Sequence, residues 1–256
     1  MDFTLKAYKQ YLEALIKNDF KFMRYDEYIL SQKTTNVCLI RHDVDRKPIN
    51  ALNMAKLESE LGVLSTYYFR IKPNTLKPKI IKEISDLGHE IGYHYESLSD
   101  TDGDIDEAVK DFEKNLKMLR KIVPIKTCSM HGRPLKPYDN RDIWKVEKNH
   151  NYLTKNLEIL GEIYLDIDYT DIAYINDTGR NWTSGKSNRR DKVNSEIIAD
   201  FSSKNELLDY LNNKPHHKIV FQVHPERWSD NKTEWLTQNA KDKMINTAKI
   251  IISIIK

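Results

Sequence analysis

The sequence predicts an α/β protein with a mostly parallel sheet, and two patterns lead to this class. Short segments rich in β-branched and aromatic residues recur along the chain, and helical patterns separate most of them. Strands and helices in turn imply right-handed crossovers, so the sheet is either closed as a barrel or open and doubly wound. In both architectures the functional groups gather at the carboxyl ends of the strands.

Seven segments are expected to be strands. They are residues 37–41, 65–70, 89–94, 125–130, 163–167, 172–175 and 218–223. The expected helices are residues 1–18, 49–61, 77–87, 105–122, 140–148, 205–211 and 239–255. Gly62 and Gly88 follow two of these helices, where a left-handed residue often ends a helix, and Pro48 stands at a helix start.

We expect the 256 residues to form a single domain, because no repeat and no linker rich in Ser, Gly or Pro divides them. With 39% hydrophobic and 31% charged residues, the composition is that of a globular protein and excludes disorder. A formal charge of +3 is far from the basic footprint of a nucleic-acid binder. No nucleic-acid partner is therefore expected.

The cysteines and the two ends of the chain favour a cytoplasmic protein. Cys38 and Cys128 lie in apolar segments without metal-type spacing, and they are too few for a disulfide framework. The first residues lack the basic and apolar regions of a secretory signal. Residues 250–255 form the longest apolar stretch, which is too short to span a bilayer, so we interpret it as part of a helix packed on the core. No stable membrane anchor is expected.

Two carboxylates follow the first predicted strand. Asp43 and Asp45 stand one residue apart, so their side chains point to the same side of an extended chain. One can bind a metal ion while its neighbour handles protons. Alternatively, Asp45 caps the helix that begins near Pro48 and Asp43 pairs with an arginine. This segment alone leaves both interpretations open.

Histidines stand where two other strands end. His94 ends the third strand and His224 follows the last one, so both are expected at the rim that carries the carboxylates. Imidazole and carboxylate groups at neighbouring strand ends suit a divalent ion with nitrogen and oxygen ligands. His131 and Arg133 follow the fourth strand, where the planar guanidinium could hold a carboxylate. A polar loop with ordinary helix capping is the alternative there.

Two further segments carry less information. His216 and His217 precede the last strand, at the opposite rim, and receive no role. Residues 177–182 match no motif, and their arginine and tryptophan, Arg180 and Trp182, either contact substrate or lie on an ordinary surface loop.

These motifs resemble those of the polysaccharide deacetylase family, the NodB-homology carbohydrate esterases of family 4. The resemblance covers residues 37–228 and implies a distorted (β/α)-barrel with about seven mostly parallel strands. It further implies a carbohydrate substrate and a divalent metal ion, with Zn²⁺ as the expected ion. Its three anchors are Arg41-His42-Asp43-Val44-Asp45, Gly88-His89-Glu90-Ile91-Gly92-Tyr93-His94 and Val223-His224-Pro225.

The resemblance also implies a role for each matching residue. Asp43 corresponds to the catalytic base, and His224 corresponds to the general acid. Asp45 and His94 correspond to two metal ligands. Residues 131–134 are similar to the family's arginine-and-proline motif, in which Arg133 would orient the base.

The sequence departs from the family at one metal-ligand position. The family places a second metal-binding histidine four residues after the first, and this chain has Leu98 there. Because leucine cannot bind a metal, either His131 or Glu96 completes the ligand set, or the site is weak or empty. We prefer His131, since imidazole restores the set of two histidines and one carboxylate.

The implied reaction is hydrolysis of an N-acetyl group on an amino sugar. A divalent ion would polarise the acetyl carbonyl and lower the pKa of its water from about 15.7 to about 7. Asp43 would take a proton from that water, and His224 would give one to the departing amine. The candidate platforms for a sugar ring are Tyr93, Tyr95, Trp182 and Trp228, with packing in the core or at the rim as the alternative.

Without a secretory signal, the expected substrate is a nucleotide-linked or lipid-linked sugar, or an oligosaccharide being assembled for a surface polysaccharide. Two other functions remain open. One is an amidohydrolase that acts on a non-sugar amide, and the other is a catalytically silent sugar-binding protein.

Overall fold

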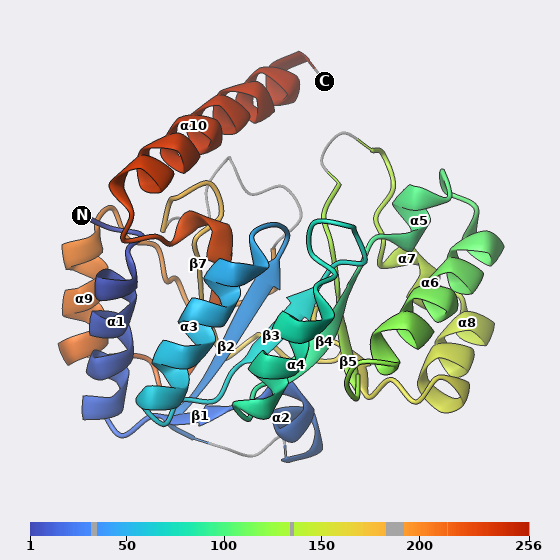
Figure 1. Cartoon of the computed structure of the whole chain (residues 1–256), viewed down its shortest axis with the longest axis horizontal. Helices are drawn as coiled ribbons and strands as arrows, with labels where there is room; N and C mark the ends of the chain where they lie inside the picture. The colour runs from blue at the N-terminus through green and yellow to red at the C-terminus, as the bar shows by residue number, and fades with distance from the viewer. Residues whose placement is uncertain (32–34, 134–135, 183–191, 214, 256) are drawn as a thin grey trace.

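A parallel sheet curled into an open barrel organises the computed structural model, which describes residues 1–31, 35–133, 136–182, 192–213 and 215–255 (Figure 1). Seven strands pair in the order β6-β5-β4-β3-β2-β8-β7, and β1 pairs with β2 beside this path. All pairs among these strands are parallel. Within the described residues, β6 and β7 end the order without pairing with each other. The predicted α/β class and distorted (β/α)-barrel are confirmed.

The described residues form eight strands, and all but β1 and β6 lie close to their predicted positions. They are β1 (Lys21–Met23), β2 (Val37–Val44), β3 (Thr66–Phe69), β4 (Glu90–Tyr95), β5 (Thr127–Met130), β6 (Gly161–Glu162), β7 (Ala173–Asn176) and β8 (Lys218–Val223). The helices are α1 (Leu5–Lys17), α2 (Tyr25–Ser31), α3 (Pro48–Glu60), α4 (Pro78–Asp86), α5 (Ser97–Asp100), α6 (Ile105–Arg120), α7 (Asp142–Lys145), α8 (Glu147–Asn151), α9 (Lys204–Asn213) and α10 (Lys232–Ile255), with a π-helical turn at Tyr152–Asn156 and a 3₁₀ turn at Pro225–Arg227.

The main local difference from the prediction concerns the strand expected at residues 163–167. The strand there is β6, which ends at Glu162. The backbone N–H groups of Leu165 and Asp166 both donate to the carbonyl of Glu162, at 2.9 Å each. The chain therefore turns where the apolar pattern predicted an extended segment, and its isoleucines pack in the core as part of a loop.

Strand β2 is the centre of the sheet, and it is buried along its whole length. Alternation sends Arg41 and Asp43 into the barrel, where the guanidinium of Arg41 lies over the ring of Tyr164 at 4.5 Å. His42 points to the outer face and contacts Glu58 of α3, with 2.7 Å between His42 Nε2 and Glu58 Oε1. The residues that follow this strand are therefore held on a rigid element.

A glycine in β4 makes room for an aromatic ring inside the barrel. A Cβ atom at Gly92 would overlap the ring of Tyr68. The hydroxyl of Tyr68 reaches Thr127 Oγ1 at 2.9 Å, so the ring bridges β3 and β5 across β4. The same face of β4 then presents His94 two residues later.

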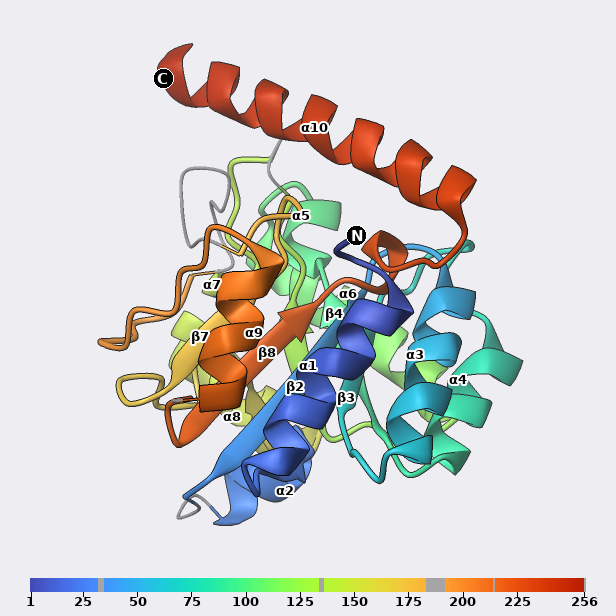
Figure 2. The ribbon, with the colours of Figure 1, turned by 90° about the vertical axis from the view of Figure 1, so that its left-hand side faces the viewer.

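Helices flank the sheet, and one of them extends beyond it. Figure 2 shows α1 and α9 beside each other along β8, and these two helices are in contact. Both views show α10 running across the molecule on the side of the strands' carboxyl ends. The described residues contain no helix that combines the length and apolarity needed to cross a membrane.

Candidate active site

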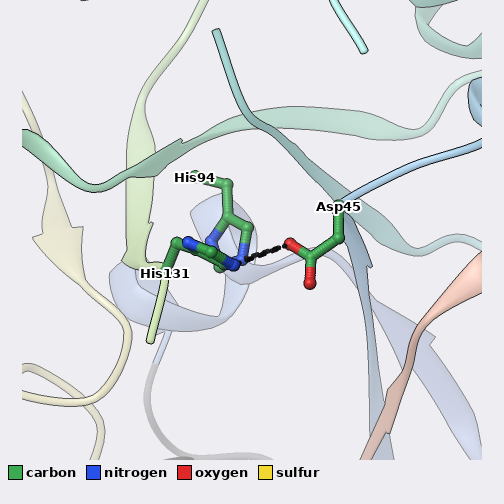
Figure 3. Close-up of side chains that lie close together, drawn as sticks. All are labelled: Asp45, His94 and His131. Carbon is green, nitrogen blue, oxygen red and sulfur yellow. Dashed lines mark ion pairs between the residues drawn. The ribbon is translucent and has the colours of Figure 1, made fainter. Parts of the chain in front are cut away.

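Three potential metal ligands meet at the carboxyl ends of β2, β4 and β5 (Figure 3). Asp45 directly follows β2, and its Oδ1 lies 3.4 Å from the Nε2 atoms of both His94 and His131. His131 extends the β4–β5 pairing, because its backbone N–H donates to the carbonyl of Tyr95 at 2.7 Å. Its side chain thereby lies beside His94, with 5.2 Å between the ring centroids.

Hydrogen bonds orient both imidazoles. The Nδ1 atom of His94 lies 3.0 Å from the carbonyl oxygen of Ser129, to which it donates. The Nδ1 atom of His131 lies 2.9 Å from Glu96 Oε2 and donates to this carboxylate. Both Nε2 atoms therefore face Asp45, as in protein metal sites where the second imidazole nitrogen is held by a carbonyl or a carboxylate.

The electrostatics of these residues favour a positive charge among them. Burial raises the pKa of Asp45, but the nearby imidazoles of His131 and His94 outweigh this effect, so the pKa lies well below its usual value. Burial lowers the pKa of His131, but Asp45 and Glu96 raise it to about 9. Asp45 Oδ1 is buried and has no hydrogen-bond donor. Two imidazoles and one carboxylate with this unsatisfied oxygen fit a Zn²⁺ ion that keeps one open coordination position.

Asp43 lies next to this cluster, inside the barrel. Its Oδ2 is 3.9 Å from His94 Nε2 and accepts a hydrogen bond from Gln222 Nε2 at 2.7 Å. Arg41 donates to both oxygens, from Nε and from Nη2, at 2.7 Å each. Burial raises the pKa of Asp43, but the charges of Arg41, His94 and His224 outweigh burial, so the pKa lies below its usual value. Asp43 is thus held as a carboxylate.

The contact predicted for Arg133 is made by Arg41. Arg133 donates instead to Glu96 Oε2 at 2.9 Å and to Asp100 Oδ1 at 3.2 Å. The reason is positional: Arg133 follows β5 at the rim, whereas Arg41 shares the buried strand and the interior face of Asp43. Pro134, the last residue of the predicted motif, lies outside the described residues.

His224 follows β8 at the same rim and is bound to Asp177, a residue to which the sequence assigned no role. Asp177 accepts hydrogen bonds from His224 Nδ1 at 2.6 Å and from its backbone N–H at 2.9 Å. Arg227 and Trp228 also donate to this carboxylate, at 2.8 Å each. Burial and the charge of Arg227 lower the pKa of His224, but Asp177 and Asp43 raise it above its ordinary value. The only available signal for Asp177 was its place directly after the strand that became β7.

Glu96 and Leu98 do not act as ligands in this arrangement. Glu96 accepts hydrogen bonds from His131, Arg133 and Arg70, the last at 2.8 Å. It therefore orients His131 through the imidazole nitrogen that faces away from Asp45. Leu98 lies in α5 and packs into the core with 3% of its surface exposed. Of the alternatives for the third ligand, the geometry places His131 beside Asp45.

The aromatic residues considered as sugar platforms are buried. Their exposed fractions range from 0% to 4%; they are Tyr93, Tyr95, Trp182 and Trp228. Trp182 stacks on Phe3 with 5.1 Å between the centroids, and Arg180 lies over Trp235 at 4.5 Å. Tyr93 and Tyr95 pack around Phe112 in the core, and Phe3 of the N-terminal segment covers Trp182 and Trp228, so core packing is the interpretation that holds.

Comparison with known proteins gives matches among solved structures alone. No family model and no curated protein matches this chain. The Bacillus anthracis protein BA3943, described as a CE4 family pseudoenzyme, shares 15% identity at a TM-score of 0.43, over 81% of this chain and 60% of that one. A BA3943 mutant described as having restored enzymatic activity matches with the same identity and TM-score, over 62% of its length.

A third solved structure is that of Bacillus subtilis PdaA, described as a family 4 carbohydrate esterase. It shares 16% identity at a TM-score of 0.42, over 90% of this chain and 82% of PdaA. The chain spans less than two thirds of the length of the BA3943 structures. All of these neighbours belong to carbohydrate esterase family 4, the family that the sequence motifs resemble.

Proposed function

We propose that this protein is a metal-dependent hydrolase that removes an N-acetyl group from an amino sugar. The observation that carries the proposal is the convergence of Asp45, His94 and His131 beside a separate buried carboxylate, Asp43. A general-acid candidate, His224, approaches from β8, close enough for its charge to lower the pKa of Asp43.

Asp45, His94 and His131 would hold the ion. When bound, it supplies positive charge that polarises an acetyl carbonyl and makes a water molecule more acidic. The hydrogen bonds of His94 to Ser129 and of His131 to Glu96 keep both Nε2 lone pairs directed at that position. The protein thus provides the ligand geometry before any ion arrives.

Asp43 and His224 divide the proton transfers. Asp43 accepts the proton of the attacking water, and Arg41 together with Gln222 keeps its carboxylate fixed while it does so. His224, whose pKa is raised by Asp177, donates a proton to the leaving amine. The base comes from β2 and the acid follows β8, and because these strands pair with each other both groups reach the same rim.

The proposed substrate is an N-acetylated amino sugar in a surface-polysaccharide precursor or oligosaccharide, nucleotide-linked or lipid-linked. The resemblance of the motifs to carbohydrate deacetylases supports the sugar.

The decisive test measures acetate release from N-acetylhexosamine conjugates by the Zn²⁺-loaded protein. Wild-type protein should release acetate, whereas Asp43→Asn should abolish turnover while keeping the bound ion. Asp100→Asn serves as the matched control, since this rim carboxylate contacts Lys72 and Arg133 without touching the cluster. Sugar binding without acetate release would indicate a silent sugar-binding protein. Cleavage of a non-sugar amide alone would indicate an amidohydrolase of another substrate class.

A further inference from the structure

A second cluster of potential metal ligands lies at the opposite end of the sheet. The carboxylate of Asp171 contacts two adjacent histidines, with 2.9 Å from Oδ1 to His216 Nε2 and 3.1 Å from Oδ2 to His217 Nε2. The two imidazole rings are 4.3 Å apart between centroids. All three side chains offer ligand atoms within 4.8 Å of one another.

The backbone holds these residues in place from several elements. Asp171 precedes β7, and His217 directly precedes β8, the partner of β7 in the sheet. The carbonyl of His217 accepts from the N–H of Val37 at 2.9 Å. The N–H of His216 donates to the hydroxyl of Tyr210 at 2.8 Å. The cluster is therefore assembled by tertiary structure and does not depend on one flexible loop.

We propose that Asp171, His216 and His217 form a second binding site for a divalent transition-metal ion such as Zn²⁺. Two neutral imidazoles and a carboxylate are the ligand types that Zn²⁺, Ni²⁺ and Cu²⁺ share. The side chains of Asp171 and His217 are 50% and 42% exposed, so water can complete the coordination sphere and an ion can enter from solvent. Six residues of β8 separate this site from the rim with His224, which is roughly 20 Å of extended chain.

Lys218 distinguishes this site from the one at the other rim. Its Nζ lies 3.2 Å from Asp171 Oδ2, where it neutralises the carboxylate. A divalent ion must compete with this ammonium group, so the site is expected to bind more weakly than the Asp45 cluster. Removing the ammonium group should strengthen ion binding. If Asp171 and Lys218 formed only a structural ion pair, this change would not affect metal affinity.

Binding at this site would join the segments that precede β7 and β8. These strands pair from Ala173 with Ile219 onward, and β7 ends the described strand order. An ion held by residues from both segments stabilises the folded chain over the unfolded one, because the ligands are brought together only by folding. The thermal midpoint should therefore rise with Zn²⁺ even when the Asp45 cluster is disabled.

Equilibrium dialysis against Zn²⁺ tests the site with the full chain. Wild-type protein should bind two ions, Asp45→Asn should bind one, and the double variant His216→Gln/His217→Gln should bind one. Lys218→Met should raise the affinity of the second site by roughly 30-fold, the effect of removing a unit charge about 4 Å from a doubly charged ion in water. His150→Gln, which changes an exposed histidine elsewhere, should leave both ions in place.

A spectroscopic measurement separates ligation from nonspecific binding. Cu²⁺ bound to the Asp45→Asn variant should show nitrogen superhyperfine coupling from two imidazoles in electron paramagnetic resonance, and His216→Gln/His217→Gln should remove it. A double variant that keeps its second ion would overturn the proposal. So would a wild-type protein whose single ion disappears with Asp45→Asn. If the wild-type protein bound one ion and His216→Gln/His217→Gln bound none, the result would support this site and count against the proposed hydrolase.

Discussion

The guanidinium of Arg41 holds both carboxylate oxygens of Asp43, which follows it by two residues on the same strand, at 2.7 Å each. Both residues are almost completely buried, with 0% and 1% of their surface exposed. The planar fork of an arginine matches a carboxylate in this way, and no lysine could replace it. Asp43 thus receives its countercharge from its own strand, which fixes its orientation independently of the loops at the rim.

Replacing Arg41 with methionine should destabilise the protein and impair its chemistry. The change leaves a buried carboxylate without its partner, so the free energy of unfolding should fall by about 3–5 kcal/mol. Arg133→Met is the matched control and should cost about 1 kcal/mol or less, because Arg133 lies at the half-exposed rim. Urea denaturation followed by circular dichroism measures both. Equal losses for the two variants would contradict a special role for Arg41.

Replacing Glu96 with glutamine should weaken metal binding without removing a ligand. The Glu96 carboxylate accepts the Nδ1 proton of His131, and such supporting contacts are worth about 10–100-fold in metal affinity. Competition with a chromophoric chelator measures the Zn²⁺ affinity, with His216→Gln/His217→Gln as background so that one site is titrated. Asp100→Asn should change the affinity little. An unchanged affinity in Glu96→Gln would show that this contact does not position His131.

Replacing Asp177 with asparagine should shift the pH dependence of activity. Asp177 raises the pKa of His224, so the imidazolium persists to higher pH in the wild-type protein. A general acid works while protonated, and activity is therefore lost as the pH rises through its pKa. In Asp177→Asn that pKa falls, so the alkaline limb of kcat/KM should move to lower pH. Asp139→Asn, which alters the partner of Arg141, should keep the wild-type profile.

The buried network around Glu58 should make stability depend on acid. Glu58 accepts hydrogen bonds from Tyr8, Ser65 and Tyr67 and contacts His42. Burial raises the pKa of Glu58, but the charge and hydrogen bond of His42 and the other contacts lower it to about 2. Its contribution is present above the unfolded pKa of about 4.5 and is lost as the pH falls toward 2.

The size of this acid effect can be measured. A difference of about 2.5 pKa units corresponds to about 3 kcal/mol, since one unit is worth about 1.36 kcal/mol. His89, whose pKa is lowered mainly by burial, adds a loss of stability as the pH falls below about 6.5. Urea denaturation between pH 7 and pH 3 should therefore show a steep decline in wild-type protein and a shallower one in Glu58→Gln. Glu147→Gln, which changes an exposed carboxylate of α8, should decline like the wild type. If the free energy of unfolding fell equally with pH in all three proteins, the network around Glu58 would not be the source of the acid sensitivity.

Much of the fold followed from local patterns. Runs such as residues 218–223 and the three-and-four spacing in residues 49–61 became β8 and α3 almost residue for residue. Such segments have one length-compatible structure that buries their apolar side chains. The strand predicted at residues 163–167 is wrong because a short apolar run also suits a buried loop. The carboxylate of Glu162 holds this turn by accepting hydrogen bonds from the N–H groups of Met130 and Tyr164.

The residues of the candidate site could be predicted where a reactive or metal-binding side chain lies at the end of a strand. Asp43, Asp45, His94 and His224 were identified by this position. Partners that act through space were not identified, since Asp177 is far from His224 in the sequence. For aromatic residues such as Trp228 the sequence left platform and core packing both open, because ring size does not indicate whether a neighbouring segment covers the ring.

The sequence by itself determined the parallel α/β architecture and which polar side chains stand at the strand ends, because both depend on spacing along a single chain. Tertiary structure decided that His131 lies beside Asp45 and His94 while Leu98 packs in the core, that Arg41 rather than Arg133 binds Asp43, and that Asp177 binds His224. The physical reason is that a hydrogen bond or a shared ion depends on distance in space, and only the curl of the sheet brings the ends of β2, β4, β5 and β8 together.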